Sequence, residues 1–374
     1  MWKSPEQVAT EQAKAEREER YTFGQYVADW QAVFNANPRK AQKTKDNYDS
    51  VLRNHLLPTF ADVPLKALDR ERIILWAREP YTAPKSRIRA FETLRKILND
   101  AAEDGCLGAS PITPRLTERV LAMFGKYRNE DDYANNVEEK HKALSARQVA
   151  PFLDSMAPEY RLLAEVLIHS GMRSGEARAL RGTDATVHLD KAVTLTVSKA
   201  VKESQGKGRY EGATKTRNTR SLTLTGELGR RLAARIEALE DPAHLIFPKP
   251  GTDDAYLSER TLLENCQRAG TGHAQDKRTP LAKRRRVCEG IGREVTVHQL
   301  RNTYAAIARA AGIDHSQRQY QLGHKPKDMT EFYEGGTQLE EQRAMADKFT
   351  AYLASHGGAP AEVVSMNKRR HHTA

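Results

Sequence analysis

Residues 296–324, which read TVHQLRNTYAAIARAAGIDHSQRQYQLGH, decide the fold of this chain. The stretch predicts two consecutive helices, over 297–311 and 314–322. His298 and Arg301 stand three positions apart in the first helix, so their side chains share one helical face. A solvated polar pair is the usual explanation of such spacing. The pair gains meaning only from the sequence around it.

The flanking sequence predicts a mainly helical domain with a small sheet. Hydrophobic periodicity predicts further helices over 146–154, 158–170, 226–240, 257–269 and 338–354. Two strands are predicted where apolar and polar residues alternate, at Val193, Leu195 and Val197 and at Leu222 and Leu224. A polar loop with Gly206, Gly208 and Gly212 separates them. We expect an α+β domain over 144–356, with a small antiparallel β-sheet, and a disordered tail over 357–374.

The first third of the chain predicts a separate all-α domain. Residues 1–20 are charged and rich in alanine, which indicates a helical lead-in. Thr22 caps the first of four helices, and the others are expected over 41–55, 69–78 and 85–103. These four helices define a domain over 21–111. Prolines and polar residues then predict an interdomain linker over 112–143, with one short helix at 115–124.

Composition limits the classes to which this chain can belong. Its 374 residues are 39% hydrophobic and 29% charged, which is sufficient for globular cores. The longest apolar run, around 162–168, is far shorter than the ~20 residues of a membrane span, and the charged N-terminus is unlike a secretory signal. Cys106, Cys266 and Cys288 form neither a disulfide framework nor a zinc motif. We expect a cytoplasmic protein with no membrane partner.

Basic residues outnumber acidic ones, 60 to 49, which gives a net charge of +11. Such an excess suggests a polyanionic partner, most commonly nucleic acid, and solvated basic faces are an equally common explanation. The basic clusters recur along the whole chain, at 39–45, 85–89, 207–220 and 283–286. This distribution favours a protein that encircles its polyanion over one with a single basic tail.

Six polar residues of the second domain form a distinctive set. They are Arg173 in Gly-Met-Arg-Ser-Gly-Glu, Lys215 at the head of a strand, His298 and Arg301 in His-Gln-Leu-Arg, His324 in Leu-Gly-His, and Tyr333 nine residues later. Each alone has an ordinary explanation, such as an ion pair with Glu176 for Arg173 or a helix C-cap for Leu-Gly-His. Together, in this order and spacing, they resemble the tyrosine recombinase (phage integrase) family. The sequence around 44–60 likewise resembles that family's core-binding (SAM-like) domain, and the resemblance spans about 20–355.

The resemblance implies a site-specific recombinase that transfers DNA strands through a covalent intermediate. Arg173, Arg301 and His324 would bind the non-bridging oxygens of the scissile phosphate, since guanidinium groups bind such oxygens in pairs. The arginine pair supplies the charge that a metal would otherwise provide, so no metal or other cofactor is expected.

The same resemblance assigns the proton transfers. Tyr333 would attack the phosphorus and form a 3′-phosphotyrosine. His298 is the candidate base for the tyrosine proton, and Lys215 is the candidate acid for the leaving 5′-oxygen. Asn302 departs from the family, where histidine is frequent after the second arginine, and 270–294 is longer and more basic than in minimal relatives.

The expected partner is double-stranded DNA at core attachment sites, held by both domains with the linker crossing the duplex. Candidate phosphate contacts in the helical domain are Lys43, Lys45, Lys85 and Arg87, and a solvated face is the competing explanation. A homotetramer on DNA is expected, in a bacterial host, with an excision factor and a host DNA-bending protein as further partners. Helix 338–354 would either dock onto a neighbouring protomer or pack within its own core.

Two alternatives share part of this reasoning. A type IB topoisomerase uses the same chemistry to relax supercoils, and the short interval from Leu-Gly-His to Tyr333 favours recombination over it. A non-catalytic DNA-binding regulator that retains the fold is a third class of protein. The complete set of six residues counts against that regulator.

Overall fold

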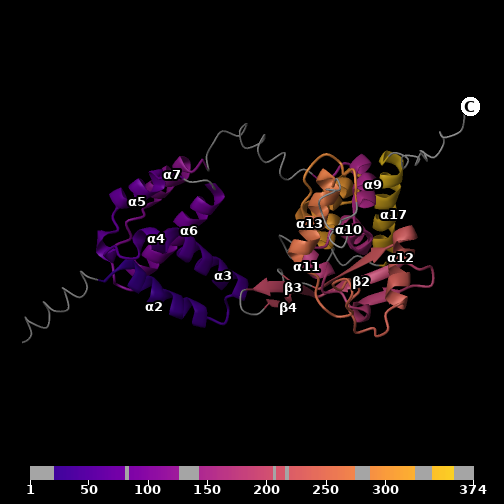
Figure 1. Ribbon diagram of the computed structural model, residues 1–374, viewed down its shortest axis with the longest axis horizontal. Helices are drawn as coiled ribbons and strands as arrows, with labels where there is room; N and C mark the ends of the chain where they lie inside the picture. The colour runs from indigo at the N-terminus through magenta and orange to yellow at the C-terminus, as the bar shows by residue number, and fades with distance from the viewer. Residues whose placement is uncertain are drawn as a thin grey trace, which may run out of the picture. The chain divides into compact units, whose positions relative to one another are not determined.

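The computed structural model describes residues 21–80, 84–125, 143–204, 208–214, 219–273, 287–324 and 339–357. The predicted lead-in over 1–20 and nearly all of the predicted tail lie outside these ranges. Two compact units divide the chain near residue 136, and each has its own hydrophobic core (Figure 1). No helix within the described ranges is long and apolar enough to span a membrane.

The first unit is entirely helical. Its elements are α2 (Phe23–Ala36), α3 (Gln42–Val51), the π-helical turn η1 (Leu52–Leu56), α4 (Leu57–Phe60), the 3-10 turn η2 (Leu65–Ala67), α5 (Arg70–Arg78), α6 (Pro84–Glu103) and α7 (Pro114–Met123). Thr22 begins α2 through a reciprocal capping box with Gln25. Aromatic rings fill much of the core, where Phe60 packs on Phe23 and Trp76.

Residues 112–125 belong to this helical core, so the prediction of a linker that begins at 112 is wrong for this part. Thr113 caps α7, and Pro114 occupies the first turn, where its missing N–H leaves no bond unmade. Leu116 and Val120 are buried, and Phe124 packs edge-on against Trp76. The short helix predicted at 115–124 therefore exists as α7, and it belongs to the helical unit instead of a linker. The remainder of the predicted linker, 126–142, lies outside the described residues.

The second unit packs around α10 (Pro158–Ser170), in which Leu163, Val166, Leu167 and Ile168 are almost inaccessible to solvent. Its other helical elements are α9 (Ala146–Ser155), α11 (Ser174–Ala177), the 3-10 turn η3 (Gly182–Asp184), α12 (Gly226–Glu237), α13 (Glu259–Thr271), α14 (Val297–Ala310), α15 (His315–Leu322) and α17 (Leu339–His356). Helices α9, α12, α14 and α17 all contact α10. Because α10 is apolar on several faces, it is enclosed on several sides.

Two small antiparallel sheets complete this unit, so the predicted fold class is confirmed. β1 (Ala185–Val187), β2 (Val193–Val197) and β5 (Arg220–Leu224) form one sheet in the order β1-β2-β5. Both predicted strands pair in it, with Val193 opposite Leu224 and Leu195 opposite Leu222. These alternating apolar residues face the core.

The second sheet is the hairpin of β3 (Lys199–Ser204) and β4 (Gly208–Ala213), in a region predicted to be a polar loop. The prediction of a loop is therefore wrong. The sequence did not indicate a strand here, because β4 has no buried residue and so shows no alternation of apolar and polar side chains. Polar contacts hold the hairpin: Arg178 donates to Glu203 of β3 at 3.0 Å, and Arg181 donates to Glu211 of β4 at 2.9 Å.

The apolar face of α17 packs within its own unit, which is one of the two arrangements left open by the sequence. Met345 and Phe349 are buried, and the Phe349 ring stacks on Tyr304 of α14 with centroids 5.3 Å apart. The same ring lies 5.0 Å from that of His169 of α10. Figure 1 shows α17 beside α9 and α10, both of which it contacts.

Candidate active site

Helix α14 begins at a capping box in which Thr296 and Gln299 exchange side-chain and backbone hydrogen bonds. The cap fixes the start of the helix, and His298 and Arg301 lie in its first two turns. His298 is exposed, whereas Arg301 is only 6% exposed. The predicted pair thus lies on one helix, with its arginine inside the unit and its histidine at the surface.

The Arg301 guanidinium joins the C-terminal ends of two helices, α10 and α15. Its Nη1 donates to the carbonyl oxygen of Gly171, directly after α10, at 2.7 Å. Its Nη2 donates to the carbonyl oxygen of Leu322, the last residue of α15, at 2.7 Å. The same Nη2 lies 3.1 Å from Nε2 of His324. Two residues predicted from separate motifs, Arg301 and His324, are therefore in direct contact.

Arg301 carries its charge in an environment that disfavours it. Burial, together with the nearby charge of Arg173, lowers the pKa of Arg301 to about 10, which keeps the side chain protonated at neutral pH. Among the described residues its partners are two carbonyl groups and a histidine, with no direct carboxylate. Since a buried cation is costly without an opposite charge, this arrangement suits an anionic ligand.

Arg173 is placed by the turn that begins α11. It is the N-cap of this short helix, and its backbone N–H and its Nη1 both donate to the Glu176 carboxylate at 3.0 Å. The Arg173 side chain is 26% exposed, whereas that of Glu176 is 1% exposed. The ion pair expected from the sequence therefore exists, and it anchors Arg173 without removing it from solvent.

His324 follows the C-cap of α15, where Gly323 adopts the left-handed conformation with φ +64°. An Arg301 N–H faces Nε2 of His324, and the Gln319 side-chain oxygen accepts from Nδ1. This pairing assigns the proton of the neutral ring to Nδ1. Burial and the charges of Arg301 and Arg173 lower the pKa of His324, so the ring is neutral at neutral pH.

A third arginine, which the sequence did not single out, completes the cluster. Arg220, the first residue of β5, donates from Nη2 to Glu176 at 2.6 Å, and both side chains are buried. Burial alone would raise the pKa of Glu176, but the charge and hydrogen bonds of Arg220 outweigh it and lower that pKa. The available signal was a charged residue at the head of an apolar strand, five positions after Lys215.

The structure thus brings Arg173, Arg301 and His324 together, with His298 one turn from Arg301. Lys215 and Tyr333 lie outside the described residues, as does the basic run 283–286. Their roles therefore remain predictions.

The four candidate DNA contacts of the helical unit differ in their surroundings. Lys43 and Lys85 are exposed, and the Lys45 ammonium donates to the carbonyl oxygen of Asn35. Arg87 is only 11% exposed, and its guanidinium lies over the Trp76 ring at 3.9 Å and pairs with Glu79. Arg87 therefore packs within its own unit, and the exposed lysines are the better candidates for phosphate contacts.

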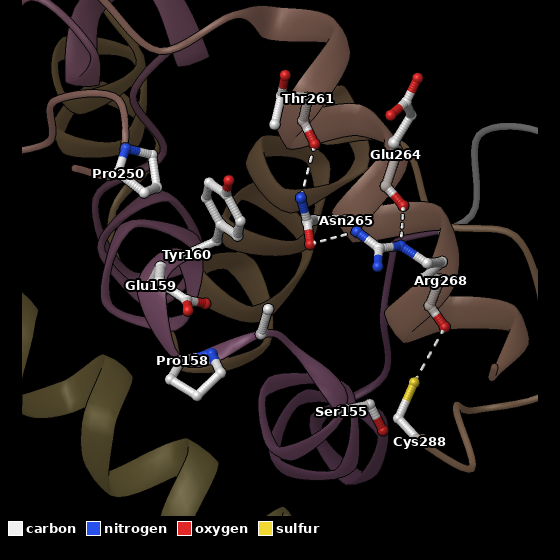
Figure 2. Close-up of a pocket in the computed structure, with 11 residues that line it drawn as sticks. Ser155, Pro158, Glu159, Tyr160, Pro250, Thr261, Glu264, Asn265, Arg268 and Cys288 are labelled. Atoms are coloured by element: carbon white, nitrogen blue, oxygen red, sulfur yellow. Dashed lines mark hydrogen bonds between the residues drawn. The ribbon is translucent and has the colours of Figure 1, made fainter. Parts of the chain in front are cut away.

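Figure 2 shows a pocket between the end of α9, the start of α10 and one face of α13. Its volume is about 390 Å³. Polar groups make up part of its wall: Arg268 donates to the Asn265 side chain at 2.7 Å, and the Cys288 thiol faces the Arg268 carbonyl oxygen at 3.6 Å. None of the predicted catalytic residues lines this pocket. The candidate active site is therefore the guanidinium cluster.

A mainly helical unit with two guanidinium groups and a histidine around one surface defines a class of protein: DNA strand transferases of the tyrosine recombinase type. The chain belongs to the phage integrase family, whose model matches residues 142–338, just over half of the chain. It is a tyrosine site-specific recombinase.

Similar proteins extend the match beyond the catalytic unit. A prophage phiRv2 integrase of Mycobacterium tuberculosis is 22% identical over 81% of this chain and 71% of its own. The Tn1549 transposon integrase, solved in complex with circular intermediate DNA, has a TM-score of 0.56 at 17% identity and covers 87% of this chain and 98% of that one. A lambda integrase tetramer bound to a Holliday junction has a TM-score of 0.54 at 17% identity, over 85% and 81%. Both structures share the fold of this chain.

Proposed function

We propose that this protein is a phage or mobile-element integrase that cleaves DNA at core attachment sites through Tyr333. The observation that carries the proposal is the contact between Arg301 and His324, beside Arg173. The buried guanidinium of Arg301 supplies positive charge, and the partly exposed guanidinium of Arg173 can donate to a ligand in solvent. A phosphodiester under attack gains negative charge on its non-bridging oxygens, and preorganised donors stabilise that charge.

In the proposed reaction, the Tyr333 hydroxyl oxygen attacks the phosphorus and its proton passes to His298. The bond from phosphorus to the 5′-oxygen breaks, and Lys215 gives that oxygen a proton. One phosphodiester is exchanged for a 3′-phosphotyrosine of similar bond energy, so the step reverses on a new 5′-hydroxyl without an external energy source. Arg173 and Arg301 hold the phosphate throughout, and His324 becomes the third donor once its ring takes up a proton on Nε2.

Double-stranded DNA is the proposed partner of both units, with Lys43 and Lys85 at phosphates. We further propose that four copies assemble on DNA in a bacterial cytoplasm, as the lambda integrase tetramer does on a Holliday junction. Excision would then call on an accessory factor and a host DNA-bending protein.

The core site is first selected from random duplexes by covalent capture. A supercoiled plasmid with two copies of this site then tests the function. We expect the wild-type protein to yield recombinant circles, and Tyr333→Phe to yield none. Relaxed plasmids without recombinants would indicate a topoisomerase. Binding without either product would indicate a non-catalytic regulator, and either result would refute the proposal.

A further inference from the structure

Arg220 is a buried charge that the proposed reaction does not use. It is 3% exposed at the first position of β5, where it pairs with Val197 of β2. Arginine is rarely buried in a strand unless its donors are engaged, because removing a guanidinium from water is costly. Its contacts therefore indicate what it is for.

Two of its donors tie separate parts of the active site together. Nη2 donates to Oε2 of Glu176 at 2.6 Å, while the other oxygen of that carboxylate accepts from Arg173 at 3.0 Å. Nε donates to the carbonyl oxygen of Gln321 at 2.9 Å, in the last turn of α15. Arg220 thus links the carboxylate that anchors Arg173 to the helix end that carries His324.

The glycine of Leu-Gly-His is part of the same arrangement. A Cβ at Gly323 would lie 2.6 Å from Nη1 of Arg220, far inside van der Waals contact. Gly323 is therefore required twice, once for its φ of +64° and once because Arg220 lies against it. The helix end fits directly onto the guanidinium.

Lysine at position 220 could not reproduce these contacts. The planar guanidinium reaches Glu176 and the Gln321 carbonyl from two nitrogens at once, whereas an ammonium offers a single point of attachment. Losing one contact would release either the turn with Arg173 or the end of α15 with His324. Displacements of about 1 Å at a reacting phosphate cost about 10²-fold in rate.

We propose that Arg220 is a positioning residue for DNA cleavage, which holds Arg173 and His324 in register around the scissile phosphate through Glu176 and Gln321. This inference rests on the proposed function, since it assumes that those groups bind the phosphate. It assigns Arg220 no contact with DNA.

Arg220→Lys tests the proposal, with Arg230→Lys on the exposed pair with Glu227 as the matched control. Duplex affinity is measured by titration. The single-turnover rate of covalent adduct formation is measured separately, at saturating protein. We expect Arg220→Lys to bind core-site DNA within about threefold of wild type and to cleave it about 10²-fold more slowly. Arg230→Lys should match wild type in both. Circular dichroism shows whether each variant is folded.

Two modified substrates separate positioning from other causes. A methylphosphonate at the scissile position is neutral, so its transition state carries less negative charge for the arginines to stabilise. The rate defect of Arg220→Lys relative to wild type should therefore shrink at least tenfold on this substrate. With sulfur as the 5′-bridging atom, the leaving group needs no acid, and the defect should persist.

Several results would overturn the proposal. They are cleavage by Arg220→Lys within threefold of wild type, an equal defect on phosphate and methylphosphonate, or rescue by the bridging sulfur, which would place the effect at Lys215. Failure of the proposed function looks different, because wild type itself would then form no adduct. If Arg220→Lys does not fold, Glu176→Gln takes its place, since it breaks the same link from the other side.

Discussion

At the scale of single residues, the site concentrates positive charge around one carboxylate. Arg173 and Arg220 share Glu176, whereas Arg301 has only carbonyl groups and a neutral histidine as its described partners. The surplus charge is held in place before any ligand arrives, so little reorganisation is needed when a phosphate binds.

Arg301→Lys should lower the rate of adduct formation by about 10²–10³-fold, because the ammonium cannot satisfy two helix ends and a phosphate together. Single-turnover cleavage at saturating protein measures the rate. The control is Arg309→Lys, at an exposed position of the same helix. Cleavage by Arg301→Lys within threefold of the control would show that this arginine does not stabilise the transition state.

His169 gives the second unit a defined sensitivity to acid. Burial lowers the pKa of His169 from 6.5 to about 4. As the pH falls below 6.5, His169 is therefore protonated in the unfolded chain before it is protonated in the folded one. The free energy of unfolding present at higher pH is lost progressively down to about pH 4. Between pH 7.5 and pH 5 this residue alone should remove about 2 kcal/mol of unfolding free energy.

His169→Leu should abolish most of that pH-dependent loss. Urea unfolding followed by circular dichroism at both pH values measures it. Trp2, Trp30 and Trp76 all precede the second unit, so tryptophan fluorescence follows unfolding of the first unit. It serves as an internal control, because His169→Leu should leave that transition unchanged. An equal pH-dependent loss in the variant and in wild type would show that another group is responsible.

At the scale of elements, the apolar pattern determined how much could be predicted. Residues 297–311 were expected to be helical and form α14 (Val297–Ala310), since periodicity and the cap at Thr296 agree. The hairpin of β3 and β4 was missed because ion pairs such as Arg181 with Glu211 stabilise it, and these join residues far apart in sequence. Similarly, a charged residue at the head of an apolar strand did not reveal the role of Arg220, because its partners Glu176 and Gln321 come together only in the folded unit.

The C-terminal helix α17 makes a prediction at this scale. Phe349→Ala should reduce the unfolding free energy of the second unit by about 3–5 kcal/mol, because it opens a cavity beside Tyr304 and His169. Thr350→Ala, at an exposed position of the same helix, should be almost neutral. Urea unfolding by circular dichroism compares them. A loss below 1 kcal/mol for Phe349→Ala would mean that α17 is not packed on its own unit.

At the scale of the whole molecule, the basic residues behind the net charge of +11 contribute unequally to DNA binding. Lys43→Ala and Lys85→Ala should each reduce the slope of log affinity against log salt concentration by about one. Arg87→Ala should instead destabilise the helical unit, since its guanidinium covers Trp76. Salt titrations of duplex binding and tryptophan-detected unfolding distinguish these effects. Unchanged slopes in both lysine variants would place the helical unit's DNA contacts elsewhere.

Covalent capture on a nicked duplex shows whether Tyr333 is the nucleophile. A duplex with a nick beside the cleavage site loses its short 5′-hydroxyl fragment after attack, so the protein–DNA adduct accumulates. We expect wild-type protein to form this adduct, mass spectrometry to map it to the tryptic peptide with Tyr333, and Tyr333→Phe to form none. An adduct that persists in Tyr333→Phe, or one attached to another residue, would show that Tyr333 is not the nucleophile.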